Sequence, residues 1–354
     1  MTIKASGGTP PTNPLSFGEI ETEFGSQSPR SLGAYRHSQT VNGLTFNGID
    51  SGIPFGTSNT DTIKFSDFYG KSLNIVVDCF SGSTQYRINA KNDKWSNNDI
   101  VIINPSTVSK RETGTKITIR VNKKIGSDKN TITNCALRTG SWNNPASVIV
   151  DLGSNAKVLG SGGNGGKGAD GISNNGEDGG DGTSGLGIEH QGTVINLRSG
   201  AIIRAGFGGG GGGGGGRETS KNDRRAGGGG GGGGAGFPIG LAGAGGVPPS
   251  GTKDGGDEKG SAGTNATETT RGVGGGGGDN EDQAFGGDGG DGGQNGINAQ
   301  NGDESSTENH NKPPGNAGSA GSNGAAIRKS SGVSFTFGID NGTKQGSTNA
   351  TGVS

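Results

Sequence analysis

The chain has 354 residues and a formal net charge of −1, and only 25% of its residues are hydrophobic. One conventional apolar core therefore cannot extend through its whole length. The near-neutral charge gives no electrostatic basis for binding nucleic acid or an anionic membrane, and no apolar segment approaches the length of a membrane span. The N-terminus lacks the apolar run of a signal peptide, so we expect assembly in a cytoplasm without export.

Residues 1–73 contain short motifs in which small polar residues stand among apolar ones. Ser16 and Ser66 are suited to cap single helical turns. We expect the aromatic side chains of this segment to pack into a small docking module, which buries too little surface to stand alone and therefore needs a partner or a homo-oligomer. The expected docking residues are Phe17, Phe24, Tyr35, Phe65, Phe68 and Tyr69.

Three strings in this segment resemble, in order and spacing, the N-terminal segment of tail-associated virion proteins of bacteriophages. The strings are SFGEIETEFG, PRSLGAYR and GIPFGTSNTDTIKFSDFYGKS. The resemblance implies that residues 1–73 attach the chain to other phage tail proteins in the virion, and it implies no chemistry.

Residues 74–159 have the pattern of a β domain. In residues 115–122 apolar and polar side chains alternate, as in a strand of a sheet with one wet face. We expect a small β-sandwich-like domain, or a β-roll, in this part of the chain. Its expected strands are 74–80, 99–104, 115–122 and 147–152.

Four residues of this domain are candidates for its interior. Trp95 and Trp142 are expected in the core or at its rim. Cys79 and Cys135 lie in apolar, strand-like surroundings, and in a reducing compartment we expect buried free thiols rather than a disulfide.

An internal repeat links the β domain to a glycine-rich region. The string SVIVDLGSNAKVLG at 147–160 aligns with TVINLRSGAIIRAG at 193–206, and both lead directly into glycine runs. Each copy predicts a pair of strands that serves as a base for the glycine segments. Returning strands are expected at 326–327 and 333–339.

Glycine recurs with a period of three in residues 160–327, for example at Gly162, Gly165 and Gly168. This is the period of an extended left-handed helix with three residues per turn. A column of glycines leaves one face bare, so another backbone can approach closely. We expect these runs, here called rods, to fold back and forth into a bundle of about eight to ten polyglycine II helices. The alternatives are a disordered linker and collagen, which needs more than the 12 prolines present.

Three runs consist of glycine alone and have bare faces all round. We expect them at the centre of the bundle, with the decorated runs outside. They are 209–216, 227–234 and 274–278. The expected fold is therefore mainly β plus a polyglycine II bundle, a glycine-rich sandwich, with little α-helix. Its expected domains are 1–73 for docking, 74–159 for the β domain, 160–327 for the rods and 328–354 for a C-terminal strand segment.

The strand-to-glycine repeat and the glycine composition of residues 147–354 resemble the receptor-binding adhesins at the tips of phage tail fibres, such as the T-even long-tail-fibre adhesins. The resemblance implies loops at the distal end of a glycine-rich sandwich that select a bacterial outer-membrane protein or lipopolysaccharide. This chain departs from that pattern by carrying its own virion-type N-terminus and β domain, so we expect it to be built directly into a tail tip rather than to cap a separate fibre.

Bulky, charged and proline residues interrupt the rods, and specific contact requires such side chains where rods offer only backbone. The arginines can engage acidic groups or phosphates, and the apolar residues can act as anchors. The candidate receptor-binding residues are Arg217, Lys221, Arg224, Arg225, Phe237, Pro238, Ile239, Pro248, Asp279, Glu281, Phe285, His310 and Pro313.

No enzyme, cofactor or metal site is expected. The three histidines, His37, His190 and His310, stand in unrelated contexts without ligands at the spacing of a metal site. The leading hypothesis is a non-enzymatic host-recognition protein of a phage tail. The alternatives are a purely structural tail component, acting as a spacer or plug, and an ice-binding protein.

Overall fold

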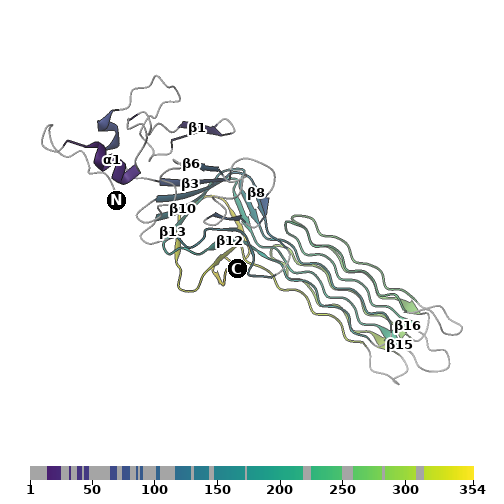
Figure 1. Ribbon diagram of the computed structural model, residues 1–354. Coiled ribbons are helices and arrows are strands. Elements are labelled where there is room, and N and C mark those ends of the chain that lie inside the picture. The colour runs from purple at the N-terminus through teal and green to yellow at the C-terminus, as the bar shows by residue number, and fades with distance from the viewer. Residues whose placement is uncertain are drawn as a thin grey trace.

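A β domain and a long bundle of glycine rods that projects from one of its corners make up most of the molecule in the computed structural model (Figure 1). The mainly β fold with glycine rods is as expected, and the described residues contain one short α-helix. None of the helices within the described ranges is both long and apolar enough to span a membrane. The structure describes residues 14–24, 32, 38–41, 44–47, 64–69, 74–79, 85–86, 88–90, 101–103, 116–128, 131–142, 147–171, 174–217, 225–248, 258–280, 284–307 and 315–354.

The N-terminal helix α1 (Phe17–Phe24) begins after the cap predicted at Ser16, and Glu19 completes a capping box there. The hydroxyl of Ser16 accepts from the amide of Glu19 at 3.2 Å, and the carboxylate of Glu19 accepts from the amide of Ser16 at 2.8 Å. The Phe17 ring packs edge to face on Phe65, with centroids 5.0 Å apart. The amide of Leu15 donates to the hydroxyl of Tyr69 at 3.0 Å. Two expected docking aromatics therefore pack together, and a third is bonded beside them.

The remaining N-terminal predictions have mixed outcomes. Ser66 lies inside the 3-10 helix η2 (Phe65–Phe68) rather than before it, and its carbonyl accepts from the amide of Tyr69. Phe24 and Phe68 lie in α1 and η2, and Tyr35 lies outside the described residues. A separate antiparallel hairpin is formed by β1 (Ser38–Val41) and β2 (Leu44–Asn47).

The β domain is a three-sided parallel β-helix, in which each coil of the chain contributes one strand to each of three sheets. The edge strand β6 (Val101–Ile103) pairs antiparallel with β3, and the other pairings within the three sheets are parallel. The coils are β3 (Asn74–Cys79), β4 (Gln85–Tyr86) and β5 (Ile88–Asn89); β7 (Lys116–Val121), β8 (Lys124–Gly126) and β9 (Cys135–Arg138); β10 (Ser147–Leu152), β11 (Lys157–Leu159) and β12 (Ser184–Ile188); β13 (Thr193–Leu197), β14 (Ile202–Arg204) and β20 (Ile327–Lys329); and β21 (Phe335–Asp340), β22 (Thr343–Gln345) and β23 (Ala350–Thr351).

This architecture corrects the expected β-sandwich and its boundary at residue 159. Strands beyond 159 belong to the same sheets, and the segment 328–354 forms part of the last two coils rather than a separate unit. The aligned repeats at 147–160 and 193–206 are successive coils, with Leu152 opposite Leu197 and Val158 opposite Ile203. Parallel strands cannot be joined by hairpins and need crossover connections. In each coil, the strands of the second and third sheets form the connection between successive strands of the first sheet.

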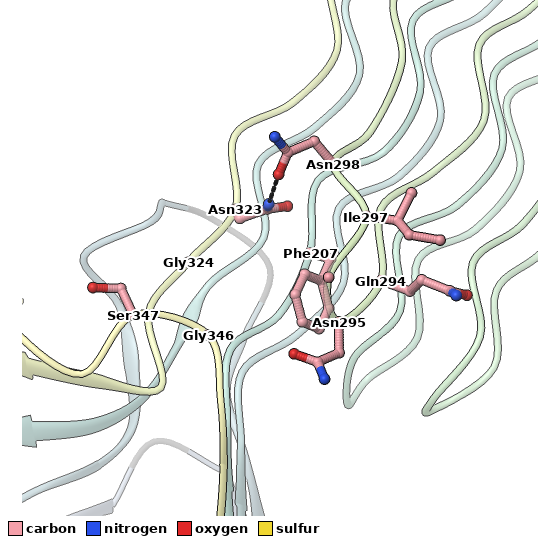
Figure 2. A pocket seen from close by; sticks show the side chains of 10 residues that line it. Phe207, Gln294, Asn295, Ile297, Asn298, Asn323, Gly324, Gly346 and Ser347 are labelled. Carbon is pink, nitrogen blue, oxygen red and sulfur yellow. Dashed lines mark hydrogen bonds between the residues drawn. The ribbon is translucent and has the colours of Figure 1, made fainter.

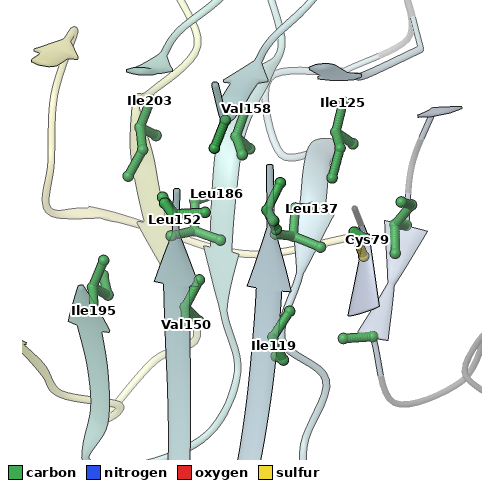
Figure 3. Close-up of a cluster of buried hydrophobic side chains, with 14 of the residues drawn as sticks. Cys79, Ile119, Ile125, Leu137, Val150, Leu152, Val158, Leu186, Ile195 and Ile203 are labelled. Carbon is green, nitrogen blue, oxygen red and sulfur yellow. The ribbon is translucent and has the colours of Figure 1, made fainter. Parts of the chain in front are cut away.

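Columns of apolar side chains fill the β-helix. Ile119, Val150 and Ile195 stack in register along the first sheet (Figure 3). Ile125, Val158 and Ile203 form the matching column of the second sheet, and Leu137 and Leu186 that of the third. All of these side chains are fully buried.

The predicted interior residues of the β domain lie inside it where the structure describes them. Cys79 and Cys135 are buried free thiols. Trp142 is 3% exposed, and its indole nitrogen donates to the carbonyl of Thr139 at 2.9 Å. Trp95 lies outside the described residues.

The rods are insertions at one corner of the β-helix, between a strand of the second sheet and a strand of the third. Residues 160–183 leave after β11 and return to β12, and residues 205–326 leave after β14 and return to β20. The described residues contain ten rods, at the upper end of the expected number. They are 160–171, 174–183, 205–217, 225–236, 239–248, 258–266, 271–279, 285–294, 297–307 and 315–326.

Two rods lie at the centre of the bundle, each with six neighbours. Successive amides of the rod 205–217 donate to three different rods in turn, with N···O distances of 2.8–3.1 Å, and its carbonyls accept from three more. This repeat of three is the geometry expected of polyglycine II. The rod 225–236 is surrounded in the same way. The neighbours of 205–217 are the rods 160–171, 174–183, 225–236, 285–294, 297–307 and 315–326.

The pure glycine run 274–278 is not central, contrary to expectation. Its rod bonds to 225–236, 258–266 and 285–294 on one side, while Gly276 is exposed on the other. Glycine permits a central position, but it does not require one.

Carboxylate and amide side chains complete the hydrogen bonding at the rim of the bundle. Oδ1 of Asp178 accepts from the amide of Ser319 at 2.7 Å, and Oδ1 of Asp181 accepts from Ser322, one turn further, at 2.7 Å. Side chains repeated every three residues therefore bond the amides of a neighbouring rod where the central lattice ends. Asn175, Asn265, Asp288, Asp291 and Asn301 act in the same way on other rods.

Replacing Asp178 with alanine is expected to lower the free energy of unfolding by about 1 kcal/mol, because the amide of Ser319 loses its acceptor. Asp178→Asn is the matched control, since its side-chain oxygen can still accept this bond. Chemical denaturation of both variants measures the difference. Equal losses for the alanine and asparagine variants would show that the acceptor contributes nothing.

Candidate functional site

The two ends of the bundle differ in what joins the rods. At the base, next to the β-helix, short turns connect one rod to the next. The opposite end, here called the tip, lies about 35 Å away, because a rod such as 225–236 rises about 3.1 Å per residue. β15 and β16 mark the tip in Figure 1. The connections between consecutive described rods at the tip span 171–174, 217–225, 248–258, 279–285 and 307–315.

Short antiparallel strands bring four of the predicted residues together at the tip. β15 (Gly216–Arg217) pairs with β16 (Arg225–Ala226), so Arg217 lies opposite Arg225. β18 (Ala284–Phe285) lies between β17 (Asp279–Asn280) and β19 (Ser306–Thr307), with Asp279 opposite Phe285. The two small sheets touch, because a Cβ placed on Gly216 would lie 2.5 Å from the carbonyl oxygen of Phe285.

Neighbouring rods complete the tip. Pro248 is buried and packs against Gly171: a Cβ added to Gly171 would lie 3.1 Å from Cγ of Pro248. Pro248 therefore stabilises the tip and offers little surface to a receptor. Val247 beside it is 51% exposed. The hydroxyl of Ser305 donates to the carbonyl of Gly215 at 3.0 Å and accepts from the amide of Gly315 at 2.8 Å. Val247 and Ser305 were not among the predicted site residues.

Phe237, Pro238 and Ile239 lie at the base, away from the predicted residues that the structure describes at the tip. The amide of Phe237 donates to Gly160 at 2.8 Å, and its carbonyl accepts from the amide of Ser127 in the β-helix at 3.3 Å. The ammonium of Lys124 lies 4.3 Å from the centre of the Phe237 ring. These residues join the rods to the β-helix, so they do not share a surface with Arg217. The predicted residues Lys221, Arg224, Glu281, His310 and Pro313 lie outside the described residues.

The position of each break along the chain was the signal that could have separated tip from base. Rods alternate in direction, so breaks fall alternately at the two ends. The break at Phe237 follows a returning rod and must lie at the base, whereas 217–225 follows an outgoing one. The same rule adds 171–174 and 248–258 to the tip.

A cluster of charges holds the base of the bundle against the β-helix. Glu268 lies in the turn that joins the rods 258–266 and 271–279. Its Oε2 accepts from Nζ of Lys124 at 2.7 Å, and its Oε1 lies 3.9 Å from Nζ of Lys157 and 3.6 Å from Nη2 of Arg204. One carboxylate of a rod turn therefore faces three cations of the second sheet.

Burial governs the protonation of this cluster. The Arg204 side chain is 3% exposed; desolvation lowers its pKa, and the charge of Glu268 offsets this only in part. Burial alone would raise the pKa of Glu268, but the hydrogen bond and charge of Lys124, with the charges of Arg204 and Lys157, hold that pKa below its ordinary value. The carboxylate is therefore ionised at neutral pH and is needed to balance a buried guanidinium.

The described part of the tip brings Arg217, Arg225, Asp279 and the half-buried Phe285 together on short paired strands, and groups of these kinds are suited to ion pairs and apolar contact. Within the described ranges, no group of three or more histidine, cysteine, aspartate or glutamate side chains is placed to hold a metal ion.

Comparisons with known proteins give two findings. The family model described as "Phage tail fibre adhesin Gp38" matches residues 83–349. The chain is also similar, at 20% sequence identity and a TM-score of 0.34, to a chain in the crystal structure of the gp37-gp38 adhesin tip complex of the bacteriophage S16 long tail fibre, with 84% of this chain and 89% of that chain covered. No curated protein matches.

Proposed function

Because the chain belongs to the Gp38 family of phage tail fibre adhesins, we propose that it recognises a receptor on the outer surface of a bacterium through the tip of its rod bundle. A tail fibre adhesin is a component of the virion tail, and the family is one of adhesins rather than of enzymes. The proposed receptor is an outer-membrane protein or lipopolysaccharide.

The gathering of the rod ends at the tip carries this proposal, because the connections between rods begin and end there. On the sides of the bundle, many of the polar side chains already bond neighbouring rods, and the apolar Leu241 and Val273 are 48% and 55% exposed there. The tip instead presents Arg217 and Arg225 on paired strands, whose guanidinium groups suit carboxylates or phosphates. Phe285 is half-buried beside them and can act as an apolar anchor.

The rigidity of the rods supports the same function. Each loop begins and ends on a rod that is bonded along its length to its neighbours, so loops can present side chains without ordering the scaffold on binding. We propose in addition that residues 1–73 attach the adhesin to other tail proteins, which the capped helix α1 and the packing of Phe17 on Phe65 support.

Replacing the connections 217–225 and 279–285 together with short glycine-serine linkers is expected to lower the rate of adsorption to host cells at least about tenfold, since the loops supply the specific contacts. Adsorption is measured with virions that carry the altered protein. The matched control replaces two cations away from the tip, Lys167→Ala on the side of a rod and Arg198→Ala on the β-helix, both substantially exposed.

Two results would contradict the proposal. Unchanged adsorption and host range of virions that assemble with both loops replaced would favour a structural spacer instead. An equal loss of adsorption in the Lys167 and Arg198 control would show that general surface charge, and not the tip, accounts for binding.

A further inference from the structure

A pocket of about 430 Å³ lies at the base of the bundle, between a rod turn and the last coil of the β-helix (Figure 2). We propose that this pocket binds a neutral sugar unit. The proposal goes beyond the function proposed for the tip, because the pocket lies at the opposite end of the rods. Its lining consists of Phe207, Gln294, Asn295, Gly296, Ile297, Asn298, Asn323, Gly324, Gly346 and Ser347.

A rigid turn forms one wall of the pocket. The backbones of Gln294 and Ile297 exchange two hydrogen bonds of 2.9 Å, which close a two-residue turn over Asn295 and Gly296. Gly296 has a φ of 81°, in the left-handed region that favours glycine, and asparagine-glycine is the preferred pair for such a turn. The backbone of this wall is therefore held in place before any ligand arrives.

A chain of side-chain amides joins this turn to the facing rod 315–326. The side-chain oxygen of Asn323 accepts from the amide of Gly208 at 3.0 Å, and its side-chain nitrogen donates to the side-chain oxygen of Asn298 at 2.9 Å. Figure 2 shows this bond at the rim of the pocket, with the Phe207 ring between the two walls. Phe207 is 4% exposed and packs against Ala205 and Ala235, so the ring is a fixed floor.

The pocket retains unused hydrogen-bonding capacity. The side-chain oxygen of Gln294 accepts from the amide of Arg271 at 3.1 Å, and that of Asn298 is used by Asn323. Among the described residues, the side-chain nitrogens of Gln294 and Asn298 and the whole side-chain amide of Asn295 have no partner. A ligand can therefore accept hydrogen bonds from the side-chain NH₂ groups of Gln294 and Asn298, and it can both donate to and accept from the side-chain amide of Asn295.

This combination of groups matches the chemistry of a sugar. Primary amides donate and accept, as hydroxyl groups do, and the 41% exposed Ile297 offers an apolar surface for the C–H face of a pyranose. No residue that lines the pocket carries a charge, which gives no compensation for burying a phosphate or carboxylate. The volume lies near the lower end of the range for small-molecule sites, so one sugar unit fits better than an extended chain.

Saturation-transfer NMR of the full chain with D-glucose, D-galactose and N-acetyl-D-glucosamine tests the proposal. We expect transfer to at least one of these sugars. Asn295→Gly keeps a dipeptide that suits the turn while removing the amide, and we expect it to raise the Kd at least fivefold. Asn298→Ala is expected to do the same. Asn155→Ala, in an exposed turn of the β-helix, is the matched control and should leave the Kd unchanged.

Three outcomes would overturn the proposal. They are no transfer to any of the three sugars, a Kd that Asn295→Gly and Asn298→Ala leave unaltered, and equally tight binding of glucose 6-phosphate, which would point to an anion site. Protein in which the 217–225 and 279–285 loops are replaced should still bind the sugar. Failure of the receptor proposal and failure of this one are therefore distinguished.

Discussion

Replacing Gly212 with valine is expected to prevent the rod bundle from forming, with a loss of at least about 4 kcal/mol in the free energy of unfolding. A Cβ at this position would lie 2.1 Å from the carbonyl oxygen of Lys167 and 2.5 Å from its carbon. Both atoms belong to the backbone of a neighbouring rod that is itself bonded, so neither can move away alone. Gly231 is equivalent, with Gly210 oxygen 2.1 Å from its added Cβ.

Gly276→Ala is the matched control for this prediction. An added Cβ there has no atom closer than Oδ1 of Asp288, at 3.9 Å, so the melting temperature should stay within a few degrees of the parent. Thermal unfolding and resistance to proteolysis measure both variants. If Gly212→Val melts with the parent protein, the rod 205–217 is not central.

Replacing Glu268 with glutamine is expected to lower the free energy of unfolding by about 2–3 kcal/mol. Breaking a buried ion pair costs about 3–5 kcal/mol because the remaining charge stays buried, and we reduce this value because the Glu268 side chain is 26% exposed while that of Arg204 is 3% exposed. Thr269→Ala changes an exposed residue of the same turn and should have little effect. A glutamine variant as stable as the alanine control would show that the cluster does not hold the bundle to the β-helix.

The contribution of Glu268 to the free energy of unfolding should decrease as the pH falls. Its pKa in the folded protein lies below the ordinary value of 4.5, so the folded state favours the carboxylate. The stabilisation is therefore fully present above about pH 4.5 and is lost as the pH falls through the lower, folded pKa. The difference in stability between the parent and Glu268→Gln should shrink over this acid range.

The sequence predicted those parts of the fold that have a local period. The period-three glycines led to the rods, and the alternation at Ile117, Ile119 and Val121 led to β7. The β-helix was missed because strands of two or three residues, such as β4 and β8, are too short to show a period. Its repeat is also interrupted, since the insertion 205–326 separates β20 from the rest of its coil.

The candidate site was only partly predictable for a related reason. Residue type alone marked Arg217, Arg225 and Phe237 as breaks between rods, and it could not say at which end each break lies. Arg204 and Glu268, which form an ion pair at the base of the bundle, are 64 positions apart in the chain and share no motif. Their contact depends on the number and direction of the rods between them.

The backbone lattice of the rods has a consequence for how the adhesin responds to temperature. Unfolding apolar surface raises the heat capacity, whereas unfolding polar surface lowers it. The bundle interior consists largely of peptide groups from the rods 205–217 and 225–236, so its heat-capacity change on unfolding should be close to zero. Its stability then rises steadily on cooling, while the apolar columns of the β-helix weaken at low temperature. The β-helix, and not the glycine bundle, therefore sets the cold limit of the molecule.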